Sequence, residues 1–170
     1  MKTYKIATKI GNLYVTCENE KIVRLESLQN GVAICNHKND LIEKLKLQLD
    51  EYFNDKRKVF DLPIKLYGTL FQLKVWQALC QIPYGKTLTY KEVAEKIGNK
   101  KAFRAVGNAC NKNPVMILVP CHRVIGTNGK LTGYAGGLEL KERLLNLEKD
   151  SKWCKMSHGI KRDIFHKTKT

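Results

Sequence analysis

The chain has 170 residues, enough for one domain of ordinary size or for two small domains that share an interface. Hydrophobic residues make up 43% of it, so it can form a buried core, which excludes a wholly disordered chain. Its 31 lysines and arginines outnumber 16 aspartates and glutamates, giving a formal net charge of +15. This excess favours a polyanionic partner such as nucleic acid, and a lysine-rich solvated surface is the simpler alternative.

The sequence also carries signals about location and metal binding. No stretch approaches the ~20 apolar residues that span a bilayer, and the first residues lack the apolar core of a secretion signal. The six cysteines are scattered without a C-x-x-C pair, which is typical of free thiols in a reducing compartment. We therefore expect a cytoplasmic protein with no membrane partner. Cys17, Cys35 and His37 form only a weak zinc candidate, because structural zinc sites usually show tighter ligand pairs.

The first part of the chain alternates apolar and polar residues in three segments, which predicts a small antiparallel sheet. Hairpin turns are expected at Gly11 and Asn12 and at residues 19–20. From Asp40 the apolar residues follow a helical spacing, with Asn39 or Asp40 as the cap. The apolar positions of this predicted helix are Leu41, Leu45, Leu49 and Tyr52 or Phe53.

A polar stretch at residues 54–58 and Pro63 indicate a linker. We expect a strand-rich α/β domain at residues 1–62, a second domain at residues 63–150, and a basic tail at residues 151–170. Thr69 is predicted to cap a helix that ends before Pro83. The apolar face of that helix is predicted to consist of Leu70, Leu73, Trp76, Leu79 and Cys80.

Two short helices are predicted to form a helix-turn-helix. Residues 89–92 read TYKE, a capping box that begins a helix at Tyr90, and the helix is expected to stop at Gly98. A second helix is predicted from Lys101 to about Lys112, after a short turn that contains the glycine. Lys101 and Arg104 lie near its start, the end that usually contacts DNA. The alternative is a helical hairpin that binds nothing, since many such hairpins have no ligand. DNA binding is the favoured interpretation.

A cysteine and a histidine follow each other at Cys121 and His122, after a buried strand or extended segment predicted at residues 115–119. A thiolate is the reactive form of cysteine, and an imidazole can take its proton. Adjacent residues of an extended chain point to opposite faces, so the pair needs a bridging water or a bend after Pro120. A third group should orient the histidine. The simpler alternative is a structural cysteine beside a surface histidine.

These motifs make the chain similar to the O6-alkylguanine-DNA alkyltransferases, also called methylated-DNA–protein-cysteine methyltransferases. The resemblance covers residues 71–148, and the first third matches only in its strand-rich character. The motifs, in the family's order, are TY at residues 89–90, RAVG at 104–107, NP at 113–114, PCHRVIG at 120–126, GYAGGL at 133–138, KE at 141–142 and LL at 144–145. The resemblance implies an α/β (α+β) fold: a small N-terminal antiparallel-sheet domain packed on a helical C-terminal domain with a helix-turn-helix.

For DNA, the resemblance implies that the damaged guanine is flipped out of the duplex into a pocket. Arg104 would fill the gap in the base stack, and Tyr90 would crowd the 3′ phosphate. The second helix, with Lys101, Ala102 and Gly107, would enter the minor groove. The implied partner is double-stranded DNA carrying O6-alkylguanine, bound by a monomer.

For chemistry, the resemblance implies that Cys121 attacks the alkyl carbon, with guanine as the leaving group. His122 and Glu148 would form the water-linked relay that ionises the thiol, and Tyr134 would donate to O6. Asn113 would brace the turns around the site. The implied pocket residues are Val124, Ala135, Gly136 and Trp76. Where some relatives carry serine this chain has Ala135, so we expect a pocket that admits bulkier alkyl groups or O4-alkylthymine.

A thioether carbon gives water no easy route to release the cysteine, so one protein should repair one lesion, without a cofactor. This predicts a single-turnover methylated-DNA–protein-cysteine S-methyltransferase. The main alternative is a lesion-sensing DNA-binding protein without transfer activity. A cysteine hydrolase using Cys121, His122 and Glu148 would leave Arg104 and Tyr90 unexplained, and a transcription regulator would more usually be a dimer.

Overall fold

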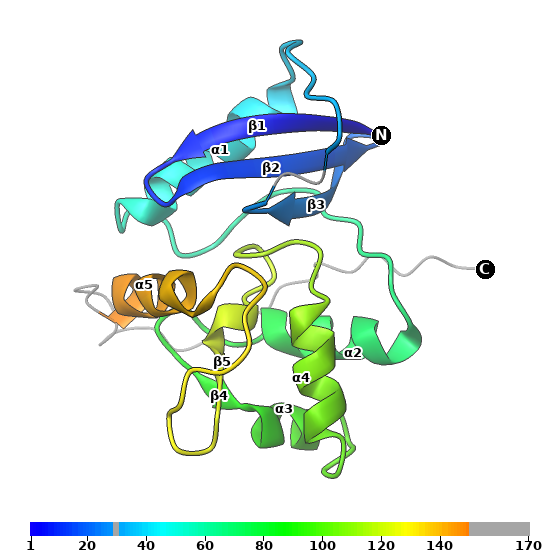
Figure 1. The fold of residues 1–170 in the computed structure, drawn as a ribbon, viewed down its shortest axis with the longest axis vertical. Coiled ribbons are helices and arrows are strands. Elements are labelled where there is room, and N and C mark those ends of the chain that lie inside the picture. Colours follow the sequence, from blue (N-terminus) through cyan, green and yellow to red (C-terminus); the bar gives the residue numbers. More distant parts are fainter. Residues whose placement is uncertain (29–30, 150–170) are drawn as a thin grey trace.

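A computed structural model describes residues 1–28 and 31–149 of the chain (Figure 1). An antiparallel sheet with one helix forms the N-terminal part, and the C-terminal part is mainly helical, so the predicted α+β fold is confirmed. The elements are β1 (Lys2–Thr8), β2 (Gly11–Glu18), β3 (Lys21–Glu26), α1 (Asp40–Phe53), α2 (Leu70–Cys80), β4 (Leu88–Thr89), α3 (Tyr90–Lys96), α4 (Phe103–Asn111), the short 3-10 turn η1 (Cys121–Arg123), β5 (Val124–Ile125) and α5 (Leu138–Lys149). The basic tail predicted at residues 151–170 lies outside the described residues.

The three N-terminal strands lie in the order β1-β2-β3, with Tyr4 opposite Val15 and Val15 opposite Leu25. The turn predicted at residues 19–20 is confirmed, because both residues have positive φ values of 46° and 59°, the geometry that suits a tight hairpin. The turn predicted at Gly11 and Asn12 is wrong. It falls at residues 9–10, where the Thr8 hydroxyl donates to the carbonyl of Gly11 at 2.7 Å and closes the loop before β2 begins.

Helix α1 covers the apolar face of this sheet. Asn39 caps it, because its side chain accepts a hydrogen bond from the backbone N–H of Ile42 at 3.1 Å. Its residues Leu45, Leu49 and Tyr52 are fully buried, as the helical spacing predicts. The sheet contributes alternate residues to the same core, so α1 and the strands bury one shared apolar layer.

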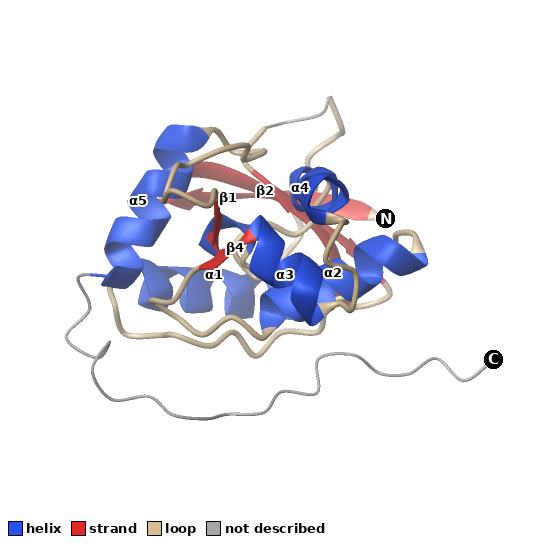
Figure 2. Ribbon diagram, turned by 90° about the horizontal axis from the view of Figure 1, so that it is seen from below, coloured by secondary structure: helices blue, strands red, loops and turns tan. Residues whose placement is uncertain are grey.

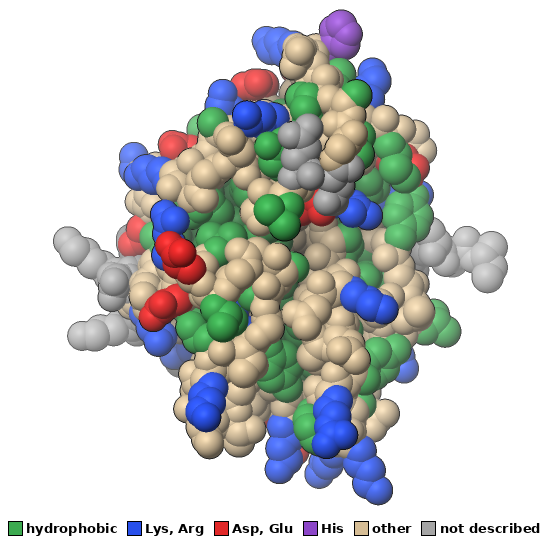
Figure 3. Space-filling model, viewed as in Figure 1, with side chains coloured by type: hydrophobic (Ala, Val, Ile, Leu, Met, Phe, Trp, Pro, Cys, Tyr) green, Lys and Arg blue, Asp and Glu red, His purple; other side chains and the backbone are tan. Residues whose placement is uncertain are grey.

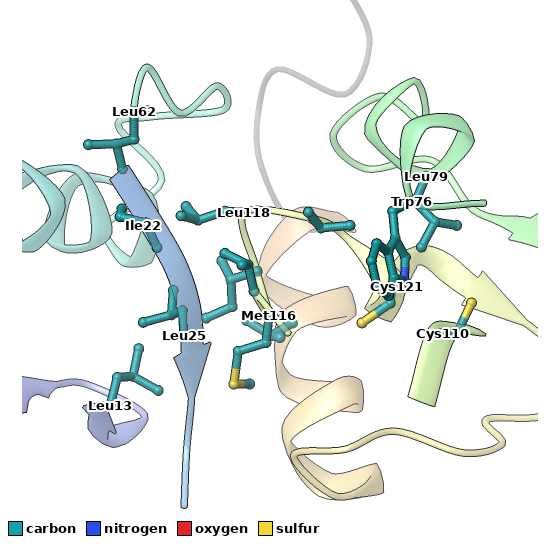
Figure 4. Close-up of a cluster of buried hydrophobic side chains, with 14 of the residues drawn as sticks. Leu13, Ile22, Leu25, Leu62, Trp76, Leu79, Cys110, Met116, Leu118 and Cys121 are labelled. Carbon is teal, nitrogen blue, oxygen red and sulfur yellow. The ribbon is translucent and has the colours of Figure 1, made fainter. Parts of the chain in front are cut away.

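The two parts of the chain share a core and backbone hydrogen bonds along β3. Ile22 bonds to Pro63 and Lys65 of the linker, and the N–H of Leu25 donates to the carbonyl of Pro114 at 2.8 Å. Leu25 also accepts from the N–H of Met116 at 3.0 Å. In Figure 4, side chains of the N-terminal part, including Leu13, Ile22 and Leu25, form one cluster with residues of the C-terminal part. The C-terminal part therefore covers the free edge of β3.

The C-terminal helices begin where the capping residues predict. Thr69 and Thr89 each form a capping box, with Gln72 and Glu92 respectively. The predicted apolar face of α2 is correct for Trp76 and Leu79 but wrong for Leu70, which is 82% exposed because it lies in the first turn, beyond the core. Helix α4 begins at Phe103, two residues later than predicted. Figure 2 views the molecule from the end that carries α3 and α4.

The segment at residues 115–119 is buried as expected but is not a straight strand. Val119 donates back to the carbonyl of Val115 at 3.0 Å, and Ile117 has a φ of 70°, so the segment folds into a tight turn. A β-branched residue is strained in this left-handed region. The surrounding core stabilises it, since Ile117 is only 2% exposed. Within the described residues, no helix combines the length and apolar character needed to cross a membrane.

Candidate active site and nucleic-acid interface

Cys121 lies in the 3-10 turn η1 rather than on a strand. The backbone bends at Pro120, and the N–H of Arg123 donates to the Pro120 carbonyl at 3.1 Å. A bend after Pro120, one of the two expected alternatives, is therefore present. Cys121 and His122 both lie in this turn, and both are buried. A sharp turn between two buried segments thus holds the candidate nucleophile.

His122 is hydrogen-bonded to Glu148 within the core, as the resemblance implies. Its Nε2 lies 2.8 Å from Oε1 of Glu148, and the two side chains are 0% and 1% exposed. Burial lowers the pKa of His122, against the opposing effect of Glu148, so the ring is neutral at neutral pH. A neutral ring that donates from Nε2 has an unprotonated Nδ1, which has no hydrogen-bond partner among the described residues. Nδ1 is therefore the atom that can accept a proton.

Glu148 is a fully occupied acceptor. Its Oε1 accepts from His122, from the hydroxyl of Tyr52 at 2.7 Å and from Nη2 of Arg123 at 2.9 Å. Its Oε2 accepts from Nε of Arg123 at 2.9 Å and from the N–H of Gly85 at 3.1 Å. Burial acts to raise the pKa of Glu148, but the bond from His122 and the charge and bonds of Arg123 hold it well below its usual range. The carboxylate stays ionised and can stabilise an imidazolium.

Asn113 contacts the candidate nucleophile directly. Its Nδ2 donates to Sγ of Cys121 at 3.0 Å and to the carbonyl of Val119 at 2.8 Å, and its Oδ1 accepts from the N–H of Val115 at 3.0 Å. It braces the turn, as the resemblance implies, and in addition it reaches the sulfur. Burial raises the pKa of Cys121 to about 11, and this donor and the charge of Lys141 act against that rise.

Lys141 is a buried cation whose role the sequence did not indicate. Its side chain is 0% exposed, and its Nζ donates to the carbonyl of Thr132 at 3.0 Å and to the hydroxyl of Tyr90 at 3.4 Å. Burial lowers the pKa of Lys141, and the nearby Cys121 opposes that shift. A buried lysine is rare unless a partner compensates it. Its position near the thiol therefore favours the thiolate.

Tyr134 supplies an unsatisfied donor. Its hydroxyl is buried and has no hydrogen-bond partner among the described residues. A buried polar group without a partner calls for an explanation such as a ligand. Gly136 permits this ring position, because a Cβ there would approach Cε1 of Tyr134 to 3.0 Å and Cδ2 of Leu140 to 2.8 Å. A buried hydroxyl without a partner that interacts electrostatically with Cys121 fits a hydrogen bond to substrate.

The other expected pocket residues differ in exposure. Val124 is fully buried and Ala135 is exposed. Trp76 is 1% exposed, and its indole N–H donates to the carbonyl of Ala109 at 2.9 Å. Trp76 therefore supports the core between α2 and α4, and its predicted contact with substrate stays a prediction.

A surface depression of about 340 Å³ lies on the helix-turn-helix. Its lining residues are Tyr90, Phe103, Arg104, Gly107, Asn108, Asn111, Thr132 and Gly133. The structure thus brings together three of the predicted DNA-binding residues, Tyr90, Arg104 and Gly107, while Lys101 and Ala102 lie just before α4. Phe103, which sequence reasoning missed, is 45% exposed, with the guanidinium of Arg104 5.8 Å from its ring centre.

Positive side chains gather at the same end of the molecule. In Figure 3 the lysines and arginines cluster at the end formed by α3 and α4 in Figure 1. The exposed basic residues of this region include Lys86, Lys91, Lys96, Lys100, Lys101 and Arg104. A basic surface around a depression suits a polyanion.

The weak zinc candidate is not supported by the structure. Among residues 1–28 and 31–149, no group of three or more histidine, cysteine, aspartate or glutamate side chains is placed to hold a metal ion. Cys17 is buried in the sheet core, and burial raises its pKa to about 11, which disfavours the thiolate that a metal requires.

The sequence of the chain is similar to those of known DNA methyltransferases. Residues 1–66 match the sequence profile of the 6-O-methylguanine DNA methyltransferase, ribonuclease-like domain, and residues 70–150 match that of the 6-O-methylguanine DNA methyltransferase, DNA binding domain. The constitutive methylated-DNA–protein-cysteine methyltransferase of Bacillus subtilis is 45% identical, with 85% of this chain and 93% of the relative covered. A Methanosarcina mazei protein of that name is 56% identical over 112 residues, 66% of this chain and 71% of its own.

Solved structures with a similar fold include proteins with related names. The crystal structure of Mycobacterium tuberculosis OGT in complex with DNA has a TM-score of 0.81 and 41% sequence identity, with 89% of this chain and 94% of that chain covered. The M. tuberculosis O6-methylguanine methyltransferase also has a TM-score of 0.81, with 40% identity over 88% of this chain and 93% of that chain. The two family profiles together match residues 1–66 and 70–150, and the chain belongs to the methylated-DNA–protein-cysteine methyltransferase family.

Proposed function

We propose that this protein repairs DNA by moving an alkyl group, irreversibly, from O6 of guanine to Sγ of Cys121. The observation that carries the proposal is the buried arrangement in which Asn113 donates to Sγ while a neutral His122, bonded to the ionised Glu148, offers a free Nδ1. Such an arrangement can deprotonate a thiol and stabilise the thiolate. The related proteins named above support the substrate class.

In the proposed reaction, the thiol proton passes through a bridging water to Nδ1 of His122, and Glu148 stabilises the resulting imidazolium. Sγ then attacks the alkyl carbon, a C–S bond forms and the C–O6 bond breaks. The electron pair of the broken bond stays on guanine. Guanine takes up the proton that the imidazolium of His122 returns through water, and it leaves as the neutral base. The free hydroxyl of Tyr134 donates to O6 and stabilises the developing charge. No step requires a cofactor.

The proposed DNA-binding surface is the depression together with its basic surroundings. Exposed lysines would neutralise phosphates, and Arg104, which is exposed on α4, would occupy the space that the flipped guanine leaves. Gly107 gives α4 a smooth surface, since a Cβ there would meet only Tyr90, at 3.8 Å. Lys101 and Ala102 precede the helix and complete the proposed contact.

The product would be a thioether in a buried site, which water cannot cleave readily. The protein would therefore act once, as a stoichiometric reagent. We also propose cytoplasmic action by a monomer, consistent with the free thiols of Cys17, Cys35, Cys110 and Cys121, and a division into domains at residues 1–62 and 63–150. The preference for bulkier alkyl groups at Ala135 can be tested by comparing benzyl and methyl substrates in Ala135→Ser.

The test is the intact mass of the protein after incubation with a duplex that contains one O6-methylguanine. We expect one added methyl group, mapped to Cys121 and absent in Cys121→Ala. Cys110→Ala is the matched control, because Cys110 is also buried but lies on α4, outside the turn that holds Cys121, and should not carry the methyl group. Salt-sensitive binding without a change in mass would instead favour the lesion-sensing alternative.

A further inference from the structure

The site receives a hydrogen bond from the N-terminal part of the chain. Tyr52 lies on α1, 96 residues before Glu148, and its hydroxyl donates to Oε1 of Glu148 at 2.7 Å. Its side chain is 0% exposed. A leucine would pack at this position without introducing a polar group, whereas a buried tyrosine hydroxyl needs a partner. The hydroxyl therefore has a purpose that core packing does not explain.

We propose that Tyr52 is a positioning residue for alkyl transfer, whose hydroxyl holds Oε1 of Glu148 against Nε2 of His122 and so makes the N-terminal sheet domain part of the proton relay. The inference rests on the function proposed above and adds a residue to it. It assigns to α1 a role in the chemistry in addition to its role in the core.

The Glu148 carboxylate is held by groups from parts of the chain other than its own helix α5. The N–H of Gly85 donates to Oε2. Arg123 spans both oxygens, and Tyr52 adds a bond only to Oε1, the oxygen that His122 uses.

The Tyr52 bond also sets how much negative charge His122 encounters. A hydroxyl that donates to Oε1 withdraws charge from that oxygen, so removing the hydroxyl should strengthen the attraction between Glu148 and an imidazolium. The pKa of His122 should then rise. Burial raises the pKa of Tyr52 well above its usual value, so Tyr52 remains a neutral donor throughout such a titration.

Other groups near the pair would be unchanged by removal of that hydroxyl. Among the described residues, the titratable or charged groups that face His122 and Glu148 are Cys121 and Arg123 of η1, Lys141 of α5, Tyr52 of α1, Tyr84 after α2 and Tyr134 before α5. Tyr52→Phe alters one of these. The ring of Tyr52 packs against Phe53, Phe60 and Tyr84 at centroid distances of 5.4, 5.2 and 6.0 Å, and phenylalanine keeps those contacts.

The first experiment is an NMR titration of the His122 ring in the full-length wild type, Tyr52→Phe and Tyr4→Phe. Tyr4 is a matched control, a buried tyrosine on β1 whose interactions are with Cys35 and Asn39 rather than Glu148. In Tyr52→Phe we expect the pKa of His122 to rise by about half a unit or more. No such rise is expected in Tyr4→Phe, even if that variant unfolds at a lower temperature.

The second experiment is the single-turnover rate of transfer from an O6-methylguanine duplex as a function of pH. The acidic limb of the profile, which reports the base of the free protein, should move to higher pH in Tyr52→Phe together with the NMR value. A folded Tyr52→Phe with the wild-type titration and profile would overturn the role of Tyr52. A wild type that gains no methyl group would overturn the proposed function instead, while the NMR titration would still test the bond to Glu148.

Discussion

The two functional regions of this molecule are built in opposite ways. Around Cys121 the polar groups are buried and bonded: among the described residues Glu148 accepts five hydrogen bonds, and Asn113 uses both ends of its amide. On the helix-turn-helix, Phe103 and Arg104 extend from α4 into solvent beside a depression. Substitutions in the first region should change stability together with activity, because they leave buried groups without partners. Substitutions in the second should change activity alone.

The largest effect is expected from Glu148→Gln, which would leave the buried Arg123 without its counter-charge. Loss of one partner of a buried ion pair costs about 3–5 kcal/mol, and loss of the relay should slow transfer by about 100-fold. Urea unfolding and single-turnover kinetics measure the two effects. Glu142→Gln, an exposed position on the same helix, serves as the control and should change neither.

The same variant should alter the dependence of stability on pH. The pKa of Glu148 is lowered in the folded protein. Its contribution to the free energy of unfolding is therefore complete above the unfolded-state pKa of ~4.3 and is lost as the pH falls toward the folded-state pKa. The wild type should therefore lose stability on acidification below that point. Glu148→Gln should lose less over the same interval, and an identical loss in both proteins would contradict the assignment of an ionised Glu148.

Lys141→Met tests the role of charge in the buried region around Cys121, because it removes a buried charge while nearly preserving the side-chain volume. Without that charge the thiolate of Cys121 is less stable, and its pKa should rise. Transfer at neutral pH should slow by about tenfold for each unit of that rise in pKa. The difference in rate between the wild type and Lys141→Met should narrow as the pH increases. Rates measured from neutral to alkaline pH test this, with the exposed Lys130→Met as control. A loss of transfer rate in Lys141→Met that does not change with pH would point to altered packing.

Arg104→Ala should separate activity from stability. Its side chain is exposed, so the free energy of unfolding should change by no more than about 0.5 kcal/mol. Transfer from duplex DNA should slow by about tenfold, because flipping costs a few kcal/mol that this side chain helps to offset. Transfer from the free base O6-methylguanine, which needs no flipping, should be unaffected. Equal losses on both substrates would place Arg104 in the reaction rather than in DNA binding.

The smallest effect is expected from Lys101→Ala. A single phosphate contact should contribute about one unit to the slope of log affinity against log salt, without changing sequence preference. Binding to undamaged duplex at several salt concentrations measures the slope. Lys46→Ala, an exposed lysine on α1 away from this surface, should leave it unchanged.

Local signals in the sequence were sufficient to predict where many helices and strands begin. Asn39, Thr69 and Thr89 each cap the helix that their side chains predict, because the bond from cap to backbone spans only three residues. The apolar alternation at residues 4–25 gives the sheet. The motif around Cys121 could be recognised because its residues are contiguous, and a bend after Pro120 was one of the two arrangements that the adjacent cysteine and histidine required.

Contacts between distant residues could not be predicted in the same way. Tyr52 was expected on an apolar helix face, and nothing in its neighbourhood indicates that its hydroxyl meets Glu148. Lys141 belongs to a recognisable motif, yet its burial depends on how Thr132 and Tyr90 are placed. The turn at residues 9–10 was misplaced because a glycine at residue 11 is a common turn signal, while here Gly11 begins β2 with a φ of 110°.

The backbone pairing along both sides of the sheet has a consequence for any attempt to dissect the protein. The N–H of Cys35 donates to the carbonyl of Thr3 beside β1, and residues 63–65 and 114–116 cover the outer side of β3. Cutting the chain at the linker would uncover β3, and an uncovered strand next to an apolar face invites intermolecular pairing. The excised sheet fragment should aggregate, and the helical fragment would retain Cys121 but lose Tyr52. The two halves are expected to behave as one cooperative folding unit.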